Sequence, residues 1–178
     1  MDSWWHNVWQ AIRAEFTDIT DEGEVTRILV RLLMAAVLGA VLGFEREHKG
    51  KAAGVRTHML VSMGAALFVL APGMAGADEQ ALSRVIQGIV AGIGFLGAGT
   101  ILKGDAEHQV KGLTTAAGIW LTAAIGVCAG LGREVTALLS TLLALAVLWA
   151  IPSGHDKTDV SASRQKSSHA EPPRQSGP

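Results

Sequence analysis

The stretch ILVRLLMAAVLGAVLGF, residues Ile28–Phe44, holds a single charged side chain, Arg31, among apolar residues. At a rise of about 1.5 Å per residue, a helix of this length matches the roughly 30 Å hydrocarbon core of a bilayer. A run that crosses lipid has to be helical, because no water is present there to satisfy the backbone. The stretch therefore predicts a transmembrane helix.

Four further apolar runs of similar length follow this one along the chain. They are His58–Ala75, Val85–Leu102, Leu113–Leu131 and Val135–Ile151. Asp78 is placed to cap the third helix, and Gly132 can end the fourth in a left-handed conformation. We expect an all-α, polytopic membrane protein of about five transmembrane helices, with a membrane domain covering residues 25–152.

The composition excludes several classes of function. Hydrophobic residues make up 49% of the chain and charged residues 17%, below the roughly 25% of an average soluble domain. No basic stripe alternates with aromatics, so no nucleic acid partner is expected. The single cysteine, Cys128, excludes an internal disulfide. The chain has no nucleophile elbow, P-loop or His-Glu-x-x-His motif, so we expect neither an enzyme nor a cofactor.

The two ends of the chain differ from the membrane domain. In residues 4–19, Trp5, Trp9 and Ile12 lie on one helical face, which predicts an amphipathic helix at the membrane–water interface within an N-terminal segment, residues 1–24. Residues 153–178 are rich in Ser, Pro, Gln and charge, which predicts a disordered tail. Lys and Arg gather in alternate loops, which predicts an outer N-terminus and a cytoplasmic tail.

A cluster of charges, GFEREHKGKAAGVRTH, joins the first two runs between Gly43 and His58. Lys49 and Lys51 suit a solvated cytoplasmic loop, and helical spacing would pair them with Glu45 and Glu47. Charges that border apolar spans are costly unless they are paired. The residues predicted to bind a ligand or partner here are Glu45, Arg46, Arg56, Thr57 and His58.

Glycines crowd the third apolar run, where small residues let membrane helices approach closely. The residues predicted to pack helices, within the bundle or between copies, are Gly88, Gly92, Gly94, Gly97, Gly99 and Gly118. Gly118, in the fourth run, is expected opposite the glycine face of the third. The alternative is a flexible or broken helix whose freed carbonyls meet a ligand or an ion. Asp105 and Glu107, in the next loop, are weak candidates for metal ligands.

Three blocks of the chain resemble the MgtC/SapB family of bacterial membrane proteins. They are GFEREHKGKAAGVRTHMLVSMGAALF, GIVAGIGFLGAGTIL and VKGLTTAAGIWLTAAIGVCAGLG. The resemblance implies an inner-membrane protein with about five spans, linked to growth under magnesium limitation and to virulence. Longer members continue into a small ACT-like cytoplasmic domain, whereas this chain is similar to the short form without it.

Two functions are compatible with these observations. The first is a non-enzymatic regulator whose helices pair with a membrane-protein partner or with another copy. The resemblance implies the rotary ATP synthase as such a partner, because one family member is thought to act on it. The second is a transporter or channel for Mg²⁺ or another ion. The second to fifth runs carry no Asp or Glu at mid-depth, although a Mg²⁺ path would be expected to offer carboxylates.

Overall fold

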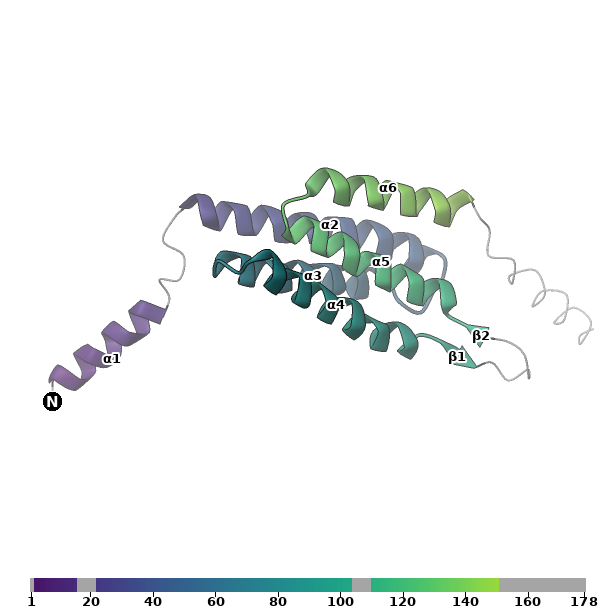
Figure 1. Cartoon of the computed structure of the whole chain (residues 1–178). Helices are drawn as coiled ribbons and strands as arrows, with labels where there is room; N and C mark the ends of the chain where they lie inside the picture. The colour runs from purple at the N-terminus through teal and green to yellow at the C-terminus, as the bar shows by residue number, and fades with distance from the viewer. Residues whose placement is uncertain (1, 16–21, 104–109, 151–178) are drawn as a thin grey trace, which may run out of the picture. The chain divides into compact units, whose positions relative to one another are not determined.

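The computed structural model describes residues 2–15, 22–103 and 110–150, and these residues are mostly helical. In chain order the elements are α1 (Asp2–Glu15), α2 (Glu22–His48), α3 (Val55–Met74), α4 (Glu79–Gly99), β1 (Leu102–Lys103), β2 (Val110–Lys111), α5 (Leu113–Gly130) and α6 (Glu134–Ala150) (Figure 1). The two short strands pair antiparallel, with Leu102 opposite Lys111. The predicted all-α fold is confirmed.

Four of the described helices, α2 to α5, are long and apolar enough to cross a membrane. The fifth predicted span corresponds to α6, a shorter apolar helix of 17 residues. The predicted helix caps are also present. Asp78 accepts a hydrogen bond from the backbone N–H of Ala81 at 2.7 Å, in the first turn of α4. Gly132, just after α5, has a φ of +72°, the left-handed conformation expected at a helix end.

The chain forms two compact units, Met1–Leu145 and Ala146–Pro178, and every interaction described below lies within the first. The predicted N-terminal helix is present as α1, with Trp5 and Trp9 exposed. Its position at a membrane interface stays a prediction. The proposed domain boundaries also stay predictions, and the tail at residues 153–178 lies outside the described residues.

The packing of the bundle centres on α3, which makes extensive contacts with α2 and α5 (Figure 1). Glycines permit these contacts. A Cβ atom built on Gly39 of α2 would lie 2.6 Å from the carbonyl oxygen of His58, and one built on Gly43 would lie 2.6 Å from the Cα atom of Val55. On α5, a Cβ on Gly126 would collide with the backbone of Ser62. These helices therefore meet backbone to backbone.

Most glycines of α4 do not make such close backbone contacts with the other described helices. A Cβ built on Gly88, Gly92, Gly94 or Gly99 would meet no atom of the described residues within 4 Å. Gly97 makes an ordinary contact, with its built Cβ 3.6 Å from that of Ala116. The expected position of Gly118 opposite the α4 glycines was wrong, because the atoms nearest to its built Cβ belong to His58 and Arg46. The prediction that the α4 glycines pack against another copy of the chain is not tested by these contacts and stays a prediction.

Candidate functional site

The end of α2 carries the first part of the charged cluster. The helix continues past Phe44 to His48, and the N–H of Lys49 still bonds to the carbonyl of Glu45 at 3.2 Å. Glu45 and Lys49 therefore lie one turn apart on the same face. Their Nζ and Oε1 atoms are 2.7 Å apart, which forms the ion pair expected from the spacing.

Glu47 does not form the second pair predicted from the spacing. Gly50 follows the helix with a φ of +63°, so Lys51 lies beyond the end of α2. The Glu47 carboxylate instead accepts a hydrogen bond from the N–H of Val55 at 2.9 Å, at the start of α3. A Cβ on Gly54 would collide with this carboxylate, so the glycine leaves room for it. Glu47 therefore satisfies one of the free N–H groups at the start of α3.

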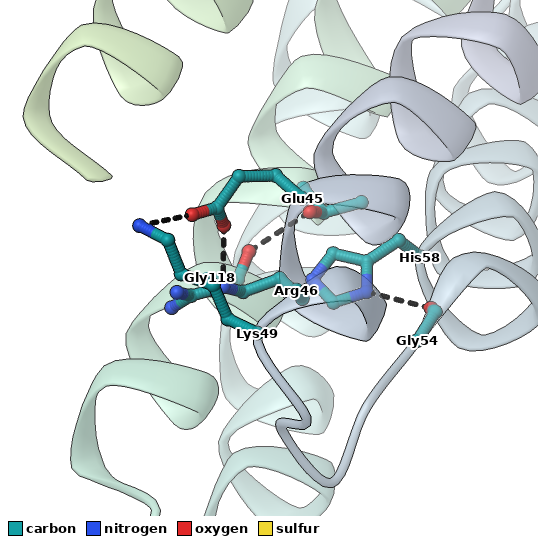
Figure 2. Close-up of polar contacts among 7 residues, drawn as sticks. Glu45, Arg46, Lys49, Gly54, His58 and Gly118 are labelled. Atoms are coloured by element: carbon teal, nitrogen blue, oxygen red, sulfur yellow. Dashed lines mark hydrogen bonds and ion pairs between the residues drawn. The ribbon is translucent and has the colours of Figure 1, made fainter. Parts of the chain in front are cut away.

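Arg46 is a buried cation, with 1% of its surface exposed. Its Nε donates to Oε2 of Glu45 at 2.7 Å, so Glu45 lies between Arg46 and Lys49 (Figure 2). One carboxylate faces two cations, which leaves the group with one excess positive charge. Nη1 of Arg46 has no hydrogen-bond partner among the described residues. The arginine fork is therefore only partly used.

His58 approaches Arg46 from the first turn of α3. Its Nδ1 lies 2.9 Å from the carbonyl oxygen of Gly54, which can only accept, so Nδ1 carries a hydrogen. Figure 2 shows the other side of the ring directed towards Arg46. Nε2 is buried and has no partner in the part of the chain that the structure describes.

Gly118 of α5 forms the third wall of this cluster. A Cβ atom built on it would lie 3.7 Å from Nε2 of His58 and 4.0 Å from Cδ of Arg46 (Figure 2). Thr122, one turn later, donates its hydroxyl hydrogen to the carbonyl of Gly118 at 2.8 Å. Ser62 of α3 is wholly buried, and its Oγ has no partner within the described ranges. The cluster therefore draws polar groups from three helices.

Only some of the residues predicted to bind a ligand or partner lie together in the structure. It brings Glu45, Arg46 and His58 together, whereas Arg56 and Thr57 are exposed on α3. Asp105 and Glu107 lie outside the described residues, so their role as metal ligands stays a prediction. Ser62 was not predicted as part of the site. Its signal is present in the sequence, because it follows His58 by four residues and so shares its helical face.

Replacing Glu47 with alanine is expected to destabilise the protein by about 1 kcal/mol, the usual effect of losing a helix cap. Glu47→Gln keeps a side-chain oxygen at this position and should lose less. The measurement is the unfolding midpoint of the purified protein in detergent. Arg56→Ala, an exposed charge removed close by, is the control. Equal midpoints for Glu47→Ala and Arg56→Ala would show that the cap does not stabilise α3.

Comparisons with known proteins give a consistent result. The MgtC family model matches residues 32–157. Protein SrpB of Synechococcus elongatus is 45% identical over 138 residues, which cover 71% of this chain and 76% of SrpB. The putative magnesium transporter YhiD of Escherichia coli K12 is 41% identical over 67% of this chain and 58% of YhiD.

Protein MgtC of Salmonella typhimurium is 44% identical over 66% of this chain. This chain spans about half of that protein, since the match covers 49% of its length. No solved structure matches the chain significantly.

Proposed function

Because the chain belongs to the MgtC family, which it matches over residues 32–157, we propose that it is a non-enzymatic regulator that acts by pairing its α4 helix with another membrane helix. That helix belongs to a second copy of the chain or to a membrane-protein partner. The family resemblance names the rotary ATP synthase as one such partner and adaptation to low magnesium as the setting.

The observation that carries this proposal is the uncovered glycine face of α4. Only Ile93 and Gly97 of this helix are buried. A groove of about 620 Å³ lies between α3 and α4, and its lining includes Gly64, Gly88 and Gly92. In lipid, helices associate through small residues that allow close approach, not through hydrophobicity alone. This apolar face suits a second transmembrane helix.

Gly92→Leu is expected to abolish this pairing without unfolding the monomer, because a Cβ at Gly92 meets no described atom within 4 Å. The measurements are cross-linking of copies in native membranes, sedimentation of the purified protein, and co-isolation of the ATP synthase. Ala124→Leu, on an exposed position of α5, is the matched control. If Gly92→Leu leaves both self-association and partner capture unchanged, the α4 pairing is wrong.

The orientation with the N-terminus outside and the tail in the cytoplasm is part of the same proposal. Arg46, Lys49, Lys51 and Arg56 lie at the α2–α3 connection, which supports placing that end of the bundle in the cytoplasm. Arg31 counts against this orientation by position. Its Nη1 donates to the carbonyl of Gly130 at 3.1 Å, so it has a structural use at the end of α5.

The second candidate is a magnesium transporter, as the name of the relative YhiD suggests for that protein. Mg²⁺ prefers carboxylate oxygens and keeps several waters. Within the described residues no group of three or more His, Cys, Asp or Glu side chains lies together. The observation that favours the regulatory proposal is the uncovered glycine face of α4. Saturable Mg²⁺ flux into liposomes holding the purified native protein would replace the regulatory proposal with transport.

A further inference from the structure

Apart from Oε1 of Glu45, which forms the ion pair with Lys49, three buried polar atoms lack a hydrogen-bond partner among the described residues. They are Nη1 of Arg46, Nε2 of His58 and Oγ of Ser62. Each belongs to a residue that is at most 1% exposed. Buried polar groups are nearly always hydrogen-bonded in native proteins, because the loss of water is otherwise uncompensated. Each of these atoms therefore needs a further partner, either an ordered water or a bound group, to complete its hydrogen bonds.

The charge of the cluster determines what kind of group fits. Glu45 is paired with both Arg46 and Lys49, at 2.7 Å in each case. One positive charge remains, and the free Nη1 of Arg46 can only donate. Arginine with unused N–H donors is suited to the oxygens of phosphate or carboxylate. The complement of this cluster is an anion.

His58 can become a second donor in the same place. Because Nδ1 donates to Gly54, Nε2 is an acceptor in the neutral ring and becomes a donor only when the ring gains a proton. Burial of the ring opposes that proton most. The charged groups that act on the ring are Arg46, which also opposes the proton, and Glu45, which favours it. The helix α5 packs against the ring with Gly118 and carries no charged side chain from Leu113 to Gly130. An anion beside Nε2 would add the charge that stabilises the protonated ring.

We propose that Arg46 and His58 bind a small oxyanion above Gly118, and that binding is accompanied by uptake of one proton on His58. The ligand class is a phosphate group, either free inorganic phosphate or the headgroup of an anionic lipid. Ser62 lies one turn deeper on the same face of α3 and offers a further hydroxyl. This site uses α2, α3 and α5, and so it does not depend on the pairing of α4.

The test measures the thermal stability of the full chain in a phosphate-free maltoside detergent. Added inorganic phosphate is expected to raise the melting temperature saturably. Sulfate should do the same at pH 6 and less at pH 8, and its own charge is constant over this range. The apparent affinity for sulfate should weaken by up to about tenfold per pH unit above the pKa of the site, as uptake of one proton requires.

Two variants locate the effect. His58→Asn keeps an amide N–H where Nδ1 stands and removes Nε2, while Arg46→Lys keeps the charge and loses the fork. Either should weaken phosphate and sulfate binding at least tenfold, whereas Arg56→Lys, an exposed arginine, should leave it unchanged. If His58→Asn does not fold, Arg46→Lys decides the question alone.

Addition of phosphatidic acid distinguishes the two sources of phosphate. If a lipid headgroup occupies the site, phosphatidic acid should stabilise the native chain, but not His58→Asn, and inorganic phosphate should then add nothing. If the ligand is free phosphate, its effect should persist with the lipid present.

Absence of stabilisation by either ligand, or equal stabilisation of the native chain and the variants, would overturn the site. Gly92→Leu should bind phosphate normally, so a failure of the α4 proposal can be told from a failure here.

Discussion

Leucine in place of Gly126 is expected to disrupt the packing of α5 on α3 and to destabilise the protein by about 3 kcal/mol, the upper end of the usual cost of overpacking. A Cβ at this position would meet the carbonyl oxygen, carbonyl carbon and Cα of Ser62. These are backbone atoms of a helix and cannot move aside as the end of a flexible side chain can. The measurement is the yield of folded, monodisperse protein in detergent together with its unfolding midpoint.

The matched control for Gly126→Leu is Gly94→Leu. Both substitutions add the same atoms to a membrane helix, but a Cβ on Gly94 meets no described atom within 4 Å. Gly94→Leu should therefore fold with a midpoint close to that of the native chain. Similar midpoints for the two variants would mean that α3 and α5 do not meet through Gly126.

The second large effect concerns the ion pair between Glu45 and Arg46. Glu45→Ala would leave Arg46, whose side chain is 2% exposed, without its carboxylate. Removing one partner of a buried ion pair typically costs about 3–5 kcal/mol, because the other charge remains buried and uncompensated. The unfolding midpoint of Glu45→Ala in detergent should fall accordingly.

Arg46→Met should have a much smaller effect than Glu45→Ala. Glu45 keeps Lys49 at 2.7 Å, and methionine occupies much of the volume of the arginine stem. Replacing a buried ion by an apolar side chain of similar size is often neutral or stabilising. The double variant Glu45→Ala, Arg46→Met should recover most of the loss. If Arg46→Met is as damaging as Glu45→Ala, the arginine is needed for folding and the predicted asymmetry is wrong.

The spans could be predicted from the sequence because lipid imposes both helical structure and length on apolar runs. The packing contacts could not. The run with most glycines, Val85–Leu102, suggested the closest contacts, yet Gly39, Gly43 and Gly126 on neighbouring helices make them. A single sequence shows how many small residues a helix carries, but not which of its faces meets a partner.

The direction in which a helix face points also explains why Arg46 is buried and Arg56 is exposed. Both lie at the end of an apolar run, and composition does not distinguish them. Gly43 follows Gly39 by four residues and Arg46 follows Gly43 by three, so Arg46 continues the face of α2 that packs on α3. Arg56 lies on the exposed side of α3. The phase of each helix, which depends on tertiary packing, therefore decides which arginine is buried.

The central place of α3 has a consequence for the order of assembly. Its contacts with α2 are close in sequence and can form as soon as both helices have been synthesised. Its other extensive contacts await α5, which is made after the peripheral helix α4. Until α5 is inserted, Arg46 and His58 lack the wall that Gly118 provides. Arg46 and His58 are therefore covered only after α5 has packed against α2 and α3. In a nascent chain that ends before Leu113, the hairpin of α2 and α3 leaves these two side chains uncovered on the side where α5 will pack.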